Sequence, residues 1–313
     1  MTTLQKPRHG RGRRTPLLRQ AAAEWQHYLL LLPAVIYLVI FCYTPMYGVQ
    51  IAFRDFRAPK GILGSPWVGL KHFVRFVQYP DFWKILGNTL SITLYSLATF
   101  PLGVVLALMM NEVRSLRFKK TVQMITYAPH FISTVVVCSM ITLFLSKSNG
   151  VINHALAALG AERIDFMTQA YMFPSIVVWS GVWQSIGWST IIYMSALAGV
   201  PEEMLEAARI DGANRLQIIW YMNLPTIMPT IITMLILSCG SLLSLGFEKV
   251  YLLQNSLNLD RSQIIATYVY QVGLVGAQFS YSSAIGLFNN LINIALLLLV
   301  NAISKRVAQI GLF

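Results

Sequence analysis

The chain has 313 residues, of which 56% are hydrophobic and only 12% are charged, and its formal net charge is +12. Soluble domains carry about 25% charged residues, so this composition favours a protein whose main solvent is lipid. Positive charge in such a chain is typical of cytoplasmic loops, which makes nucleic-acid binding the weaker interpretation. The composition therefore predicts a membrane protein that crosses the bilayer several times.

Six apolar segments are long enough to cross ~30 Å of hydrocarbon as helices. Helices are expected because each one satisfies its own backbone hydrogen bonds in lipid. The expected fold class is an all-α membrane protein with six transmembrane helices. The predicted segments lie near residues 28–51, 88–111, 121–146, 172–198, 225–247 and 284–303.

Lysine and arginine residues predict the orientation of these segments. They are concentrated before the first segment, in the 2–3 and 4–5 connections, and after the sixth segment. All four regions lie on one side of a six-helix arrangement, which places both termini in the cytoplasm. The 1–2 connection, residues 52–87, is also basic and is expected to form a cap on the outer face. The predicted organisation is a basic cytoplasmic tail over 1–27, a transmembrane domain over 28–306, and a C-terminal tail over 307–313.

The connection at 200–224 carries the pattern of two short helices joined by a glycine. Pro201 suits the first turn of a helix, and the two glutamates that follow it lie at the positive end of the helix dipole. Gly212 can take the left-handed conformation that ends a helix, and Asn214 can cap a second one. The result is a helix–glycine–helix elbow on the cytoplasmic face. Such an elbow fits a groove on a partner, or it lies along the membrane interface.

The elbow contains EAARIDGA at 206–213, followed by Pro225. This pattern resembles the EAA loop of permease subunits in ATP-binding-cassette importers. One departure is Ile219, where that family often has an aromatic residue. The resemblance extends over residues 28 to 306 and is carried further by YTPMYG at 43–48, FRDF at 53–56, YAPHFIS at 127–133, NSLN at 255–258 and FSYS at 279–282.

Within these importers the chain is similar to the carbohydrate-uptake group of the maltose type, in particular to LplB-like oligosaccharide and aldouronate permeases. The resemblance implies the MetI-like permease fold of type I importers, in a bacterial plasma (inner) membrane. It also implies a heterodimer with a second, homologous permease, two ATPase subunits that bind ATP and Mg, and an extracellular or periplasmic solute-binding protein. No cofactor is expected in this chain, which would carry out no catalysis itself. By resemblance, the residues that dock into the ATPase are Glu206, Ala207, Ala208, Asp211, Gly212 and Ala213.

Aromatic and polar side chains inside the predicted spans suggest a sugar pathway. Sugars stack on aromatic faces and bond to amides and hydroxyls, and polar groups inside a membrane tend to face a cavity or another helix. For any single residue the structural alternative is favoured, since Ser and Asn join helices and Trp marks the interface. As a cluster they favour a polar pathway. The candidates are Trp179, Trp183, Gln184, Trp188, Tyr193, Ser241, Glu248, Asn289, Asn290 and Asn293.

Other residues are expected to have structural roles. His130 is predicted to be buried and hydrogen-bonded, and Pro129 to kink the third helix. The three cysteines, Cys42, Cys138 and Cys239, are predicted to be buried thiols, and the scattered histidines show no metal-ligand spacing.

Two rival functions are weaker. An enzyme would need a motif such as the phosphate loop of ATPases, which is absent from the sequence. A proton-coupled secondary transporter would need ionisable groups inside the membrane, for which only Glu248 and His130 are candidates. Among importers, a permease for another solute such as glycerol phosphate remains open. The basic outer loop and the nearest family type favour a uronate oligosaccharide, such as an alginate- or aldouronate-like one.

Overall fold

The computed structural model describes residues 25–241 and 246–308. The described secondary structure is helical, apart from two isolated β-bridges, which confirms the all-α class. The chain divides into two compact units, Met1–Gln50 and Ile51–Phe313. Most of the predicted tail over 1–27, and all but two residues of the tail over 307–313, lie outside the described residues.

The first unit provides most of one apolar helical span, Trp25–Phe53, which is 29 residues long and whose last residues, from Ile51, belong to the second unit. Its helical geometry changes around Pro45, where the missing N–H interrupts the regular bonding pattern. The hydroxyl of Thr44 donates to the Val39 carbonyl at 2.8 Å, one turn earlier. The elements are α2 (Trp25–Tyr37), the π-helix η1 (Leu38–Tyr43), α3 (Thr44–Met46) and the 3-10 helix η2 (Tyr47–Phe53).

The second unit contains three more helical spans that are long and apolar enough to cross a membrane. The first two are interrupted next to Pro101 and Pro225, as expected from residues that cannot donate a backbone hydrogen bond. The first span, Phe82–Asn111, is made of α6 (Phe82–Ala98) and α7 (Pro101–Asn111). The second span, Arg215–Gly240, is made of α13 (Arg215–Ile218), the π-helix η6 (Ile219–Asn223) and α14 (Leu224–Ser241). The third span, Phe279–Arg306, lies within α18 (Phe279–Ala308).

The third predicted segment, 121–146, is a broken helix. The chain bends by 103° between the helix that ends at Phe131 and the one that begins at Thr134. Pro129 lies at the break, as predicted, and the Ser133 hydroxyl accepts from the Val136 N–H to cap the helix after it. The elements are α8 (Leu116–Tyr127), the 3-10 helix η4 (Ala128–Phe131) and α9 (Thr134–Phe144).

The fourth predicted segment, 172–198, forms the 25-residue helix α11 (Phe173–Leu197). By length and hydropathy, the described ranges hold four helices that can cross a membrane, or five with the bent pair, and α11 is not among them. The count of six spans therefore stays a prediction.

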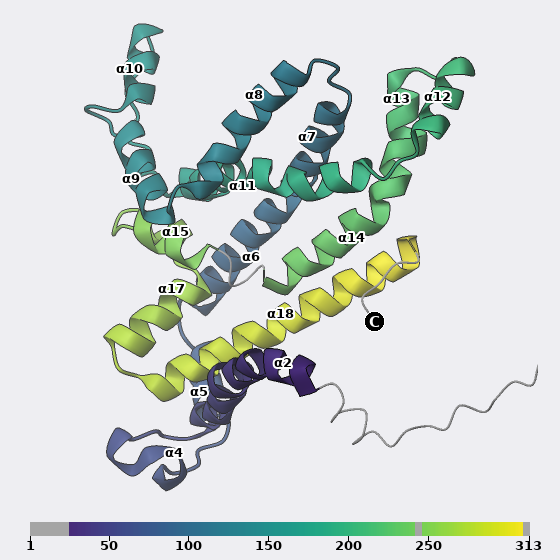
Figure 1. Ribbon diagram of the computed structural model, residues 1–313. Helices are drawn as coiled ribbons and strands as arrows, with labels where there is room; N and C mark the ends of the chain where they lie inside the picture. The colour runs from purple at the N-terminus through teal and green to yellow at the C-terminus, as the bar shows by residue number, and fades with distance from the viewer. Residues whose placement is uncertain (1–24, 242–245, 309–313) are drawn as a thin grey trace, which may run out of the picture. The chain divides into compact units, whose positions relative to one another are not determined.

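Within the second unit, α11 is the central element, because it packs against α7, α8 and α14 (Figure 1). Helix α14 lies beside α18, so α7, α11, α14 and α18 form a continuous series of packed helices (Figure 1). Buried side chains of Val104, Ala107, Tyr193 and Ile227 join the first three of these helices.

A glycine allows the close approach of α11 to α8. A Cβ added at Gly187 would collide with the carbonyl group of Thr126. Helix packing in lipid depends on such small residues, because no hydrophobic force draws the helices together there.

Short helices fill the connections of the second unit. Phe76, Phe82, Ile265 and Tyr281 form a second buried cluster, which attaches the short helices α5 and α17 to α18. The short elements are η3 (Ala58–Lys60), α4 (Gly61–Gly64), α5 (Lys71–Val77), α10 (Val151–Ala158), η5 (Ala170–Met172), α12 (Glu202–Ile210), α15 (Phe247–Leu253), α16 (Leu259–Ser262), α17 (Ile265–Tyr270) and the π-helix η7 (Gln271–Val275).

Candidate functional site

The elbow between α11 and α14 begins with the acidic helix α12, Glu202–Ile210. Pro201 has an extended backbone (φ −61°, ψ 129°), so it occupies the N-cap position of α12. The first turn, in which Pro201 was predicted to lie, begins one residue later. Glu202 and Glu203 lie in the first turn and Arg209 in the last. Each charge opposes the partial charge of the nearer helix end, which stabilises this short helix.

Gly212 ends α12 with a left-handed backbone, φ +86°. The Gly212 N–H donates to the Arg209 carbonyl at 3.2 Å, and the Ala213 N–H donates to the Ala208 carbonyl at 2.9 Å. These two bonds form the Schellman motif, which satisfies the last carbonyls of a helix. A Cβ at Gly212 would meet no atom within 4 Å, so a substitution there would strain the backbone without crowding a neighbour.

Asn214 starts the second helix of the elbow with a capping box. Its Oδ1 accepts from the Gln217 N–H at 2.9 Å, and Gln217 Oε1 accepts from the Asn214 N–H at 2.7 Å. Two N–H groups that have no partner inside the helix are thereby satisfied. The predicted helix–glycine–helix elbow is confirmed, with both helices fixed by local hydrogen bonds.

The six candidate coupling residues lie on this elbow. Glu206, Ala207, Asp211 and Gly212 are exposed, whereas Ala208 and Ala213 are half-buried. Ala208, Asp211, Gly212 and Ala213 line a hollow of 370 Å³, to which Glu206 and Ala207 do not contribute. Because alanine and glycine form part of its lining, a partner's side chain can come close to the backbone here. The remaining lining residues are Gln217, Ile218, Tyr221 and Met222.

A second polar site surrounds Gln184, in the middle of α11. Its Nε2 donates to the carbonyl of Ile132 at 3.0 Å, at the break between α8 and α9. Its Oε1 accepts from Lys249 Nζ at 3.0 Å. The amide thus joins three parts of the chain: α11, the broken helix and α15.

Lys249 is 8% exposed, and its ammonium group lies over Gly181 of α11. No ion pair of the described residues includes it. The adjacent Glu248, which was the predicted pathway residue, is exposed. The structure therefore places the lysine, and not the glutamate, in the interior.

Lys249 was not among the predicted site residues, although its sequence context contains a signal. Lys249 lies one helical turn before Leu253 and beside Val250, which are both buried. Residues four apart share one face of a helix, so this lysine belongs to the apolar face of α15. The charge of Glu248 made it the candidate, but charge alone does not indicate which face of a helix a residue occupies.

One turn further along α11, Trp188 stacks on His130 of η4, with ring centroids 4.4 Å apart and planes at 6°. The indole is 45% exposed, and Phe131 packs its edge against it. His130 is half-buried and not buried as predicted, because the helix break presents its ring to α11. The pair leaves an aromatic surface next to Gln184.

The other pathway candidates are not gathered at this site. Trp179 donates from Nε1 to the hydroxyl of Tyr95 at 2.8 Å, and both Trp179 and Trp183 are exposed. Tyr193 is buried in the core between α7, α11 and α14, which fits a structural role.

The remaining candidates lie on α14 and α18. Asn289 and Asn293 are buried and Asn290 is exposed, all three on α18. The side chain of Ser241 lies outside the described residues. The candidates with described side chains therefore lie on three separate helices, α11, α15 and α18.

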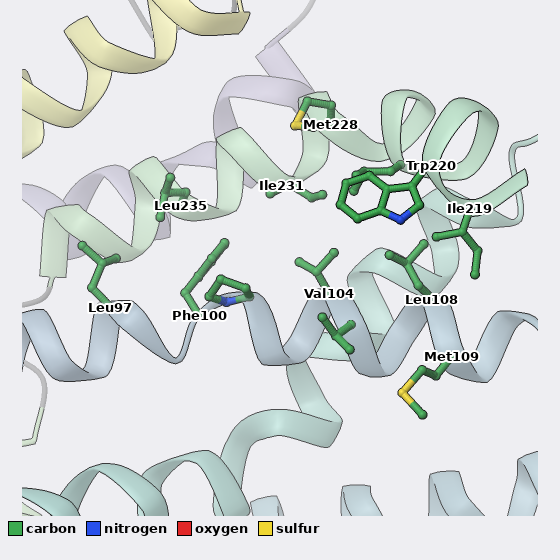
Figure 2. A pocket seen from close by; sticks show the side chains of 13 residues that line it. Leu97, Phe100, Val104, Leu108, Met109, Ile219, Trp220, Met228, Ile231 and Leu235 are labelled. Atoms are coloured by element: carbon green, nitrogen blue, oxygen red, sulfur yellow. The ribbon is translucent and has the colours of Figure 1, made fainter. Parts of the chain in front are cut away.

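An apolar groove elsewhere in the chain does not suit a sugar. A groove of 540 Å³ runs between α7 and α14, and Figure 2 shows Phe100, Val104 and Leu108 on one side of it and Met228 and Ile231 on the other. Its lining is aliphatic and aromatic. Sugar hydroxyl groups would lose their hydrogen bonds to water here without replacement, so the groove is not a carbohydrate site.

The described part of the chain contains no group of three His, Cys, Asp or Glu residues that could hold a metal ion. Cys138 and Cys239 are buried free thiols, as predicted, but Cys42 is exposed.

Comparison with known proteins decides the class of this chain. Residues 100–309 match the family described as binding-protein-dependent transport system inner membrane component. The chain belongs to this family. It is therefore a helical permease component of a membrane transport system, of the MetI-like fold, that works with a solute-binding protein.

Curated relatives extend the likeness to nearly the whole chain. The polygalacturonan/rhamnogalacturonan transport system permease protein YteP of Bacillus subtilis (strain 168) is 42% identical over 302 residues, which cover 96% of this chain and 94% of YteP. Protein LplB of the same organism is 44% identical over 287 residues, which cover 91% of this chain and 90% of LplB. The resemblance to LplB-like permeases is confirmed.

The fold is similar to that of a solved transporter. A chain of a bacterial alginate ABC transporter, crystallised in complex with an alginate pentasaccharide-bound periplasmic protein, matches with a TM-score of 0.87 and 37% identity. The match covers 95% of this chain and 99% of that chain. A second structure, of a bacterial ABC transporter involved in the import of the acidic polysaccharide alginate, matches with the same TM-score and 38% identity.

Proposed function

We propose that this permease translocates an acidic oligosaccharide as part of an ATP-driven importer. The observation that carries the proposal is the likeness, at 37% identity and over 95% of the chain, to a permease chain of an alginate transporter. The 42% identity to a polygalacturonan/rhamnogalacturonan permease supports the same class of substrate. No observation favours glycerol phosphate or a proton-driven mechanism.

The proposed assembly contains a second, similar permease, two ATPase subunits that bind ATP and Mg, and an external binding protein. A single chain leaves its candidate pathway residues on separate helices, which supports a path shared with a second subunit. In the proposed topology the chain crosses a bacterial inner membrane six times, with both termini in the cytoplasm. The basic residues of the 2–3 and 4–5 connections support this orientation.

The elbow is the proposed contact with the ATPase subunits. Exposed Glu206, Asp211 and Gly212 and the hollow beside the last two offer an acidic, closely approachable surface. The capping bonds of α12 and α13 make the elbow rigid, so a displacement of the elbow would be transmitted along η6 to α14. Closure of the ATPase pair on ATP would in this way move α14 and the helices packed against it.

Two measurements test this proposal together: the association of the permease with the ATPase subunits, and the dependence of ATP hydrolysis on the substrate. The chain is expressed with the other subunits of its importer, purified in nanodiscs, and mixed with binding protein that carries either a uronate or a neutral oligosaccharide. We expect the ATPase subunits to co-purify and the uronate-loaded protein to stimulate hydrolysis more strongly. Stimulation by the neutral sugar alone would contradict the acidic substrate, and failure to co-purify would contradict the ATP-driven assembly.

A further inference from the structure

We propose that Lys249 is a substrate-binding residue that pairs with a carboxylate of the acidic sugar during its passage. The inference rests on the proposed function and adds to it the group that recognises the charge. It is carried by the geometry around the Lys249 ammonium group.

The ammonium group of Lys249 is held in the interior by neutral groups. Its acceptor is Gln184 Oε1 at 3.0 Å, and a Cβ at Gly181 would lie 3.9 Å from it. The side chain is 8% exposed, and it takes part in none of the ion pairs formed by the described residues. A buried cation without a counter-charge is costly, and inside a membrane protein such a residue points to function.

The side-chain amide oxygen of Gln184, Oε1, is an acceptor that a substrate can replace. An ionised carboxylate binds an ammonium group more strongly than a neutral amide does. Gln184 is half-buried, so rotation of its side chain would uncover the ammonium group of Lys249. The exchange of one acceptor for another needs no proton transfer, and it leaves no buried charge unpaired while the sugar is bound.

The surroundings of Lys249 fit a sugar ring next to the carboxylate. Trp188 lies one turn from Gln184 on the same face of α11, and 45% of its surface is exposed. Its stacking on His130 fixes the plane of the indole. A uronate residue could therefore contact the aromatic face of Trp188 and place its carboxylate toward Lys249.

The site also lies at the break between two helices. Gln184 bonds to Ile132, which has the extended backbone (φ −82°, ψ 130°) of the break between α8 and α9. Cys138 of α9 approaches the carbonyl of Lys249 at 3.9 Å. Broken helices form the binding sites of many transporters, since they combine exposed polar groups with a hinge. Release of Gln184 from Lys249 would thus also affect its hydrogen bond to Ile132 at the bend.

A matched pair of substitutions at Gln184 tests the inference. Gln184→Met and Gln184→Glu both remove the bond to the Ile132 carbonyl, but only the glutamate supplies Lys249 with a permanent counter-charge. The assembled importer is reconstituted in proteoliposomes, and uptake of a labelled uronate pentasaccharide is measured per ATP hydrolysed. We expect this ratio to be about tenfold lower for Gln184→Glu than for Gln184→Met, as for loss of a bond to a charged group.

Substitution of the lysine completes the test. Lys249→Met should lower the same ratio about tenfold, and Lys249→Arg should restore part of it. Lys147→Met removes one positive charge outside this site and is the control for net charge; it should match the wild type.

Two results would contradict the inference in different ways. Equal uptake by Gln184→Glu and Gln184→Met would show that Lys249 is structural and would leave the proposed function intact. A wild-type importer that takes up no uronate sugar would contradict the proposed function and the inference together.

Discussion

Gly212 shows how a single residue can fix the shape of a contact surface. Its φ of +86° is a conformation that costs an L-residue about 1 kcal/mol or more, whereas glycine adopts it freely. Since nothing lies within 4 Å of a Cβ at this position in the isolated chain, the need for glycine arises from the backbone and from whatever docks there. The sequence could predict the left-handed turn, because a glycine directly after a short helix is typical of a helix end.

Gly212→Ala is predicted to impair coupling much more than folding. The chain offers a matched control in Gly160, which ends α10 with φ +79° and the same pair of backbone bonds. Both substitutions should lower the unfolding temperature by about 2 °C. Only Gly212→Ala should reduce ATP hydrolysis stimulated by the binding protein, by about fivefold or more. An equal loss of hydrolysis in Gly160→Ala would assign the effect to stability and not to the docking surface.

The surroundings of Lys249 could be predicted from the sequence only in part. The spacing of Val250 and Leu253 can indicate the face of α15 that is buried. It cannot indicate that the buried ammonium group meets Gln184, which is 65 residues away in the chain. Such a pairing depends on how α15 packs on α11, and only the structure contains that information.

At the scale of the elements, α11 depends on close contacts with its neighbours. Gly187 faces the Thr126 carbonyl of α8 with no room for a methyl group, and Gly103 of α7 faces the side chain of Ser189. Backbone atoms cannot withdraw as a flexible side chain can. Helices α8 and α11 would have to separate to accept any larger residue at position 187.

Gly187→Ala is therefore expected to destabilise the protein, by about 1 to 3 kcal/mol from overpacking. Gly87→Ala in α6 serves as the control, since a Cβ there meets nothing within 4 Å and alanine favours a helix. Thermal unfolding in detergent should show a lower midpoint for Gly187→Ala and an equal or higher one for Gly87→Ala. Equal midpoints for the two variants would contradict the close packing of α11 on α8.

Some features of the helices could be predicted from single residues in the sequence. The elbow followed from its glycine and its cap residue, and the structure confirms both. Pro129 correctly predicted a kink, but its size, 103°, could not be predicted, because it depends on the extended Ile132 and on the packing of α9 against α15. For the same reason the half-exposed position of His130 was not foreseen.

In the proposed topology of the chain, the elbow and the loop after α10 lie on opposite sides of the membrane. Ile210 in the elbow and Leu159 in that loop are equally exposed, at 86% and 85%, so they can be compared directly. In a variant whose three native cysteines are replaced, an impermeant maleimide added to intact cells should label Leu159→Cys and leave Ile210→Cys unlabelled. Labelling of Ile210→Cys from outside would reverse the proposed orientation.

In the proposed importer, ATP hydrolysis on partner subunits drives an acidic oligosaccharide through this permease. Uptake of a labelled uronate oligosaccharide can be measured in proteoliposomes that contain the complete importer and its binding protein. We expect uptake that requires ATP on the elbow side and stops when vanadate blocks the ATPase. Uptake that persists with vanadate and follows a proton gradient instead would contradict ATP-driven transport.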